Sequence, residues 1–285
     1  MMARPNPPER AVADPLHSLR GWNLPSSQWS AEGPDPADLL APVALAIGFL
    51  AIWEAVVRAI GVPRWLLPPP SEIAAALVAN WPLIYQHALV TLAEITVGFG
   101  LAFFGGVVLA VAIARSRVVD RALYPLVVAS QTVPVVAIAP LLLIWFGYGL
   151  WPKALVVALI CFFSIVVNTV DGFRAVDPDL VDLLRTMGAT DRQIFQKIEV
   201  PSALPYLLSG TKIAVAVSVI GAVIGEWVGA QAGLGYLMIR SVSQFQTARV
   251  FACIVVLSAI GVVLFGIVAL VERLALAYRL AARRE

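Results

Sequence analysis

Apolar and polar segments alternate along the chain from residue 38 onward. A helix that crosses a membrane needs about 20 largely apolar residues, because each residue adds about 1.5 Å to its length. The pattern therefore predicts an all-α integral membrane protein with six transmembrane helices. The predicted spans are 39–60, 88–114, 122–146, 154–170, 206–228 and 250–271.

The pattern marks some spans more clearly than others. Residues 250–271 contain no charged side chain and form the clearest span. Residues 154–170 are close to the lower limit of length. In the span 206–228, Lys212 and Glu226 fall near the ends, where we expect their charged groups to reach the polar interfaces.

The segment before the first span differs in kind. Residues 1–37 are rich in Pro, Ser, Asp and Arg and contain no apolar run, so we expect a disordered cytoplasmic tail ahead of a transmembrane domain over 38–285. The tail lacks the apolar stretch of a cleavable signal peptide. Near the outer end of the first span, Glu54 and Arg58 are spaced to pair at i,i+4.

The connection between the first two spans predicts a short helix on the outer membrane surface. Prolines at 68–70 argue against a helix at that point, and Ser71 is expected to cap one that begins at Glu72. Its apolar side would hold Ile73, Leu77 and Trp81.

Composition supports the membrane assignment and excludes other classes. Hydrophobic residues make up 60% of the chain and charged residues 13%, against about 25% charged in soluble domains. A net charge of +2 without a basic patch argues against nucleic acid. Cys161 and Cys253 lie in apolar segments and are expected to be small core residues. His17 and His87 form no catalytic constellation, which argues against an intramembrane enzyme.

Lysine and arginine are distributed unevenly between the two sides of the membrane. With the amino terminus inside, fifteen of them face the cytoplasm and five face outward. This bias predicts that both termini and residues 171–205 are cytoplasmic. The five outward residues would be Arg58, Arg64, Lys153, Arg240 and Arg249.

The longest cytoplasmic loop, 177–201, carries the signals of two short helices. Asp177-Pro178 is typical of an N-cap followed by proline in the first turn. Gly188 is expected to end the first helix in a left-handed conformation. Thr190 and Gln193 predict a capping box at the start of the second helix.

Both loop helices have an apolar side, and we expect Pro201 and Pro205 to close the segment before the next span. An apolar face at this place either packs under the spans or meets a partner protein, and the pattern alone leaves both interpretations open. The residues concerned are Leu180, Leu183, Leu184 and Met187 in the first helix and Ile194, Phe195 and Ile198 in the second.

The same loop resembles the signature loop of binding-protein-dependent ABC importer permeases. That family has an acidic residue with two small ones, then glycine, then isoleucine and a leucine-proline pair, at these spacings. Here two leucines replace the usual alanines and Val200 replaces leucine, which keeps the apolar character. The matching residues are Asp182-Leu183-Leu184, Gly188 and Ile198-Glu199-Val200-Pro201.

The resemblance extends over roughly 67–279. Three further segments, 67–72, 144–149 and 233–236, are similar to the branch that carries nitrate, sulfonates, taurine and vitamin precursors. The resemblance implies the type I ABC importer permease fold in the bacterial cytoplasmic membrane. It also implies a second permease copy or a related permease, two ATP-binding subunits and an extracytoplasmic substrate-binding protein.

On this reading the chain is not an enzyme and binds no cofactor or metal, since ATP and magnesium belong to the partner subunit. Gly210-Thr211-Lys212 lacks the glycine spacing of a phosphate loop. The resemblance assigns ATPase coupling to the loop 182–201. The expected coupling residues are Asp182, Leu183, Leu184, Gly188, Ala189, Thr190, Phe195, Ile198 and Pro201.

Polar residues within the spans are candidates for the solute pathway. For Glu94 a pathway role and a helix–helix clasp are equally open. Asn168 more readily fits an interface cap, and Glu226 is expected to contact the binding protein or a partner span. A polar break in the third span adds a possible cavity lining. The full candidate set is Glu94, Gln131, Thr132, Pro134, Asn168 and Glu226.

Two further interpretations concern glycines and the solute. The repeat Gly221, Gly225 and Gly229, like Gly105-Gly106, predicts close helix approach. Because no arginine is seen at membrane depth, we favour a neutral nitrogen compound such as a thiamine-pyrimidine precursor or riboflavin. Nitrate, sulfonate or taurine is the alternative within the class. A secondary transporter or channel is the rival class, although we find no internal repeat.

Overall fold

The computed structural model describes residues 36–282, and every regular element in that range is a helix. The expected tail, 1–37, lies almost wholly outside the described residues, and the first helix begins at Pro36. The elements are α1 (Pro36–Ile60), α2 (Pro70–Ala79), α3 (Trp81–Arg115), α4 (Arg117–Ser130), α5 (Val135–Phe146), α6 (Leu150–Arg174), α7 (Pro178–Thr186), α8 (Asp191–Ile194), a π-helix (Phe195–Glu199), α9 (Val200–Gly229), α10 (Leu234–Ser243) and α11 (Thr247–Ala282).

The described residues fall into two units that divide between Leu50 and Ala51, within α1. Five helical stretches of the described residues are long and apolar enough to cross a membrane, and a sixth is broken. This agrees with the all-α transmembrane fold that the apolar pattern predicts. The unbroken stretches are Leu40–Ile60, Trp81–Arg115, Leu150–Arg174, Asp191–Gly229 and Thr247–Leu276.

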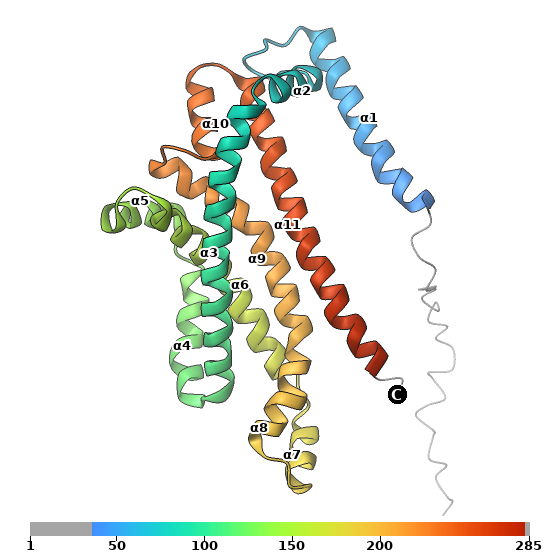
Figure 1. Cartoon of the computed structure of the whole chain (residues 1–285), viewed down its shortest axis with the longest axis vertical. Coiled ribbons are helices and arrows are strands. Elements are labelled where there is room, and N and C mark those ends of the chain that lie inside the picture. The colour runs from blue at the N-terminus through green and yellow to red at the C-terminus, as the bar shows by residue number, and fades with distance from the viewer. Residues whose placement is uncertain (1–35, 283–285) are drawn as a thin grey trace, which may run out of the picture. The chain divides into compact units, whose positions relative to one another are not determined.

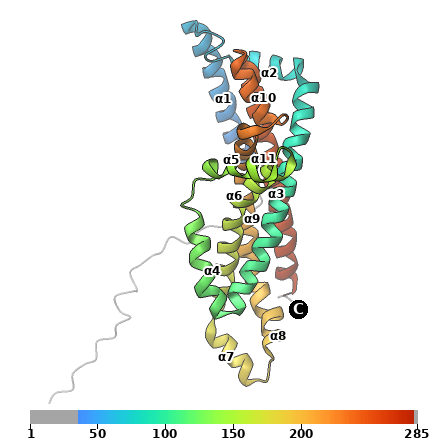
Figure 2. The same ribbon diagram turned by 90° about the vertical axis from the view of Figure 1, so that its left-hand side faces the viewer.

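Within the larger unit, α6 is packed between α3 and α9 (Figures 1 and 2). The residues that join them are small or branched and fully buried, including Val157, Cys161 and Ala214. The Cys161 thiol donates to the Ala214 carbonyl oxygen over 3.2 Å. Both cysteines are buried and reduced, which confirms their expected place in the core.

Glycines permit this close approach. A Cβ at Gly221 would lie 3.1 Å from the Val157 Cα, and one at Gly225 would lie 3.2 Å from the Lys153 Cα. At Gly229, the third of the series, a Cβ would meet a Leu143 methyl at 2.5 Å. The predicted close packing is confirmed, and its consequence is that the Lys153 backbone lies directly against α9.

The third predicted span is broken rather than bent. Helices α4 and α5 meet at an angle of 102° across the residues from Gln131 to Pro134. Proline donates no backbone hydrogen bond, and the Ser130 and Thr132 hydroxyls turn back to the carbonyls of Val127 and Ala129 at 2.6 and 2.8 Å. The predicted interruption is confirmed, and it is much sharper than a proline kink.

The short helix after α1 differs from its prediction in two ways. It begins at Pro70, because proline suits the first turn of a helix, and Pro69 precedes it without a side-chain cap. Ser71 is not a cap: its amide and hydroxyl both donate to Glu54, at 3.0 and 2.8 Å. The predicted pair of Glu54 and Arg58 is confirmed at 2.6 Å.

The prediction that Pro201 and Pro205 close the loop before the next span is wrong. The chain stays helical from Asp191 to Gly229, through the π-helix over Phe195–Glu199. Pro201 lies in the first turn of α9, directly after the π-helical stretch. There the backbone hydrogen bonds change from the i→i+5 spacing of a π-helix to the i→i+4 spacing of an α-helix. The second half of the loop is therefore a continuous extension of a transmembrane helix.

Candidate functional site

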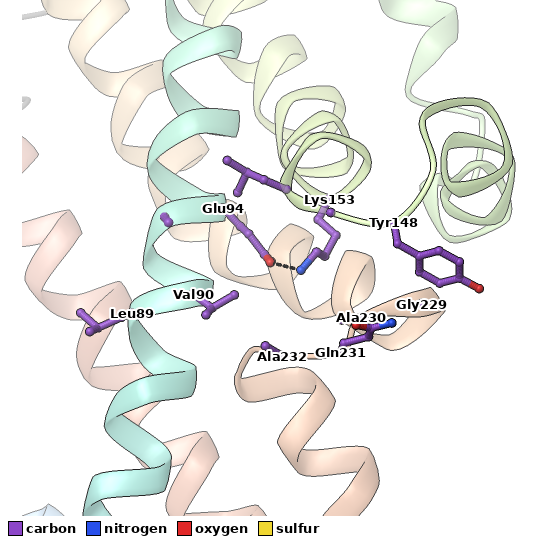
Figure 3. Close-up of a pocket in the computed structure, with 12 residues that line it drawn as sticks. Leu89, Val90, Glu94, Tyr148, Lys153, Gly229, Ala230, Gln231 and Ala232 are labelled. Carbon is purple, nitrogen blue, oxygen red and sulfur yellow. Dashed lines mark hydrogen bonds and ion pairs between the residues drawn. The ribbon is translucent and has the colours of Figure 1, made fainter.

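Three charged side chains are buried together in the larger unit. Glu94 on α3 is 0% exposed, Lys153 on α6 is 9% exposed and Glu226 on α9 is 1% exposed. A charge at membrane depth costs on the order of 2.5–3.5 kcal/mol on insertion scales, so each requires a partner. Glu94 and Lys153 form an ion pair and hydrogen bond (Figure 3).

Glu226 joins three helices at the beginning of α10. Its carboxylate accepts hydrogen bonds from the backbone amides of Gly235 and Tyr236 and, over 2.6 Å, from the Thr91 hydroxyl. Amides in the first turn of a helix have no partner within the helix, and a carboxylate there meets the positive end of the helix dipole. Glu226 therefore holds α10 against α3 and α9.

Two further bonds complete this junction. The Leu234 amide donates to the Thr91 hydroxyl over 2.8 Å, and the Gly233 amide donates to His87 Nδ1 over 2.9 Å. The burial of Glu226 leaves no carboxylate surface for an external binding protein. The contact with Thr91 agrees with the alternative, in which Glu226 meets a neighbouring span.

A cavity of about 520 Å³ lies beside the ion pair. Its polar lining includes Glu94, Lys153 and the rim residue Tyr148, while Leu89 and Val90 contribute apolar wall (Figure 3). Small residues leave the space open where α9 ends and α6 begins: Gly149, Gly229, Ala230 and Ala232. The volume lies in the range of small-molecule sites, about 300–1,000 Å³.

The structure brings together only two of the six predicted pathway residues. Glu94 and Glu226 are neighbours, and Glu94 lines the cavity. Gln131, Thr132 and Pro134 are exposed at the break between α4 and α5. Asn168 faces α9 near Gly210 and donates to the Ser164 carbonyl over 2.7 Å. The pathway roles of all six remain predictions.

Lys153 is the residue that sequence reasoning missed. It was expected at the outer surface, and the preference for a neutral solute rested on the lack of a cation at depth. That premise is wrong, because Lys153 lies in the first turn of α6 and is buried beside Glu94. The signal was present in Trp151-Pro152-Lys153: proline favours the first turn, so the helix starts before the apolar run.

The loop has the local structure that its sequence predicts. The Asp177 side chain accepts from the Asp179 amide over 2.9 Å and caps α7. Thr190 and Gln193 form the predicted capping box at α8. Gly188, between them, has φ +87°. Figures 1 and 2 show α7 and α8 at the end of this unit opposite α10.

The two halves of the loop differ in burial. No residue of α7 is buried, and Leu183 and Met187 are 56% and 75% exposed. In the second half Ile194 is 2% exposed, and Phe195 stacks on Phe173 of α6 with ring centroids 5.8 Å apart. Phe195 thus anchors the loop to the spans, while α7 presents an uncovered apolar face.

The five other predicted coupling residues are divided between the two halves of the loop. Asp182 is exposed and pairs with Arg185 at 3.5 Å, and Ala189 follows the left-handed turn. Leu184 and Ile198 line a notch of about 370 Å³ between α7 and the second half of the loop. Pro201 is half-buried in the first turn of α9.

Comparison with known proteins identifies the class. Residues 102–276, more than half of the chain, match the family model described as "Binding-protein-dependent transport system inner membrane component". The chain therefore belongs to this family of ABC transporter permeases. The solved inward-facing MetNI methionine ABC transporter shares the fold, with a TM-score of 0.60, 20% identity and coverage of 69% of this chain and 98% of that chain.

Two curated relatives are more similar in sequence. The formylaminopyrimidine transport permease protein ThiX of Halalkalibacterium halodurans is 42% identical over 84% of this chain and 96% of its own. The riboflavin transport system permease protein RibX of Chloroflexus aurantiacus is 36% identical over 90% of this chain and 94% of its own. These relatives are transport permeases, and the chain is a multi-pass ABC importer permease rather than a secondary transporter or channel.

Proposed function

We propose that this chain is the membrane subunit of a bacterial importer in which separate ATPase subunits drive uptake of a neutral pyrimidine-type or flavin-type solute. The observation that carries the coupling is the uncovered apolar face of α7, next to a helix that runs unbroken from Asp191 to Gly229. A motor bound to α7 would move a rigid lever, because the loop continues into the membrane.

The proposed function includes three kinds of partner subunit. A second permease copy or a related permease completes the pathway, and an extracytoplasmic binding protein delivers the solute. ATP and magnesium belong to the ATPase chains. The uneven distribution of Lys and Arg supports placing both termini and α7 on the cytoplasmic side of the inner membrane.

Two observations support the solute class. ThiX and RibX, at 42% and 36% identity, are described as formylaminopyrimidine and riboflavin permeases. The buried cation in the cavity, Lys153, is paired with Glu94, so it offers no net charge to an anion. Nitrate, sulfonate or taurine is the alternative, supported by weaker relatives such as the taurine permease TauC of Escherichia coli at 28% identity.

The test is reconstitution of the permease with its ATPase and binding protein in lipid. ATP hydrolysis is measured with the binding protein loaded with formylaminopyrimidine, riboflavin, taurine or nitrate. We expect stimulation by one of the first two. Stimulation by taurine or nitrate alone would refute the solute class, and hydrolysis that is indifferent to the permease would refute the coupling.

A further inference from the structure

Lys153 is the more exposed member of the ion pair that lines the cavity. Its side chain is 11% exposed and that of Glu94 is 0% exposed, although both line the cavity (Figure 3). A solute that enters this space therefore contacts the Lys153 side chain, whereas the Glu94 side chain is covered.

The ion pair has unused hydrogen-bonding capacity. An ammonium group has three N–H donors, and Glu94 is the acceptor that the described residues provide for Lys153. Glu94 is fully buried beside Glu226, so its second carboxylate oxygen is not a group that a solute reaches. Buried polar groups are rarely left without partners, so the two remaining N–H donors of Lys153 are suited to an outside acceptor.

The charge of the pair decides what kind of group fits. Glu94 balances Lys153, and the other nearby carboxylate, Glu226, is held by the amides of Gly235 and Tyr236. The cavity thus presents donors without a net positive charge. An anion would gain from Lys153 and be repelled by both carboxylates, whereas a neutral acceptor gains without that repulsion.

We propose that Lys153 is a solute-recognition group that donates hydrogen bonds to ring-nitrogen or carbonyl acceptors of a neutral heteroaromatic solute, and that Glu94 orients and neutralises it. This assignment rests on the proposed function and places a specificity site inside the membrane subunit. The largely apolar wall, with Leu89, Val90 and Leu150, suits a planar ring beside the polar pair.

The chain offers a matched control for this site. Lys212 on α9 pairs with Glu272 on α11 at 2.7 Å, with side chains 25% and 18% exposed. This second pair joins two spans, and neither of its residues lines the cavity. A variant of it changes a helix–helix clasp without changing the proposed recognition group.

The experiment measures direct binding to the assembled permease–ATPase complex in lipid nanodiscs, without the binding protein. The probes are labelled formylaminopyrimidine and a labelled alkanesulfonate, which is a net anion, measured by equilibrium dialysis. We expect Lys153→Met to weaken formylaminopyrimidine binding by about 10-fold or more, the value of one or two charge-assisted hydrogen bonds. Glu94→Gln should shift the preference toward the sulfonate by about 10-fold, because it removes one of the two carboxylates that repel an anion.

Controls separate recognition from assembly. The pair Lys212→Met with Glu272→Gln should leave the ratio of the two affinities unchanged. If Lys153→Met alone does not assemble, the double variant Lys153→Met with Glu94→Gln restores a neutral pair and should still lose binding. Unchanged affinity in an assembled Lys153 variant would overturn the proposal and leave the pair as a helix clasp.

Uptake into proteoliposomes distinguishes this proposal from the proposed function. If the complete importer takes up formylaminopyrimidine or riboflavin while the complex itself binds neither, the cavity site is refuted and the function stands. If the importer takes up neither compound, the solute class fails and the recognition site fails with it.

Discussion

Replacing Gly188 with arginine separates an effect on docking of the ATPase from an effect on folding of this chain. Gly188 has φ +87°, and a Cβ built there meets nothing within 4 Å. The cost to the chain is therefore the left-handed backbone alone, about 1–2 kcal/mol, with no clash. Domains of ordinary stability, about 5–15 kcal/mol, tolerate that loss, so the variant should fold and insert normally.

The cost to a docked partner is larger. Arginine would project from the turn beside the uncovered face of α7, into the space that a bound ATPase would fill. Forcing extra atoms into a packed contact costs about 1–3 kcal/mol, which weakens association by roughly 5- to 150-fold. We expect uptake in proteoliposomes to fall by about 10-fold or more, together with the hydrolysis stimulated by the loaded binding protein.

Two variants control for the backbone. Gly61 has φ +69° and is equally open, in the connection between α1 and α2, so Gly61→Arg carries the same strain without touching the loop. Gly188→Ala carries the strain without the bulk. Both should retain near-normal uptake. Uptake at the wild-type rate in a normally inserted Gly188→Arg variant would refute docking at this turn.

Two further predictions concern the membrane core. Gly225→Val should lower stability by about 1–3 kcal/mol, because a Cβ there already lies 3.2 Å from the Lys153 Cα, whereas Gly266→Val, in open space, should not. Thermal unfolding in detergent measures both, and equal melting temperatures would contradict the close packing of α6 on α9. Thr91→Val should leave Glu226 and the Leu234 amide each short of a partner, at about 1–3 kcal/mol. Hydrogen exchange should speed up at the start of α10, and unchanged protection there would refute its attachment through Thr91.

Local signals determined much of this protein. The lengths of the apolar segments predicted the spans, because the length of a helix is proportional to its number of residues and must match the thickness of the membrane. Capping patterns predicted that Asp177 caps α7, that Thr190 and Gln193 form a capping box, and that Gly188 is left-handed. These predictions held because each depends only on residues within about four positions. The anchor spacing of the loop was sufficient to indicate the permease family, which the comparison confirmed.

Proline was the local signal most often misread. Pro70 was taken to argue against a helix, but it lies in the first turn of α2, where the missing N–H has no consequence. Pro201 was taken to close the loop, but it lies directly after the π-helix in a stretch that stays helical. Pro134 does mark a break, but the 102° angle between α4 and α5 depends on how the two helices pack afterwards. A sequence specifies that a backbone bond is missing and does not specify the direction the chain then takes.

Tertiary structure alone decided which buried charges meet. Glu94 and Lys153 are 59 residues apart, and Thr91 and Glu226 are 135 apart, so no spacing rule connects them. The position of a residue along a transmembrane helix determines its depth in the membrane. Which side chain it contacts depends on how the helices are rotated and packed against one another. Here the glycines of α9 bring α6 close enough to carry Lys153 inward. The sequence showed polar groups at depth, and helix packing joined Glu94 and Lys153 into an ion pair that lines a cavity.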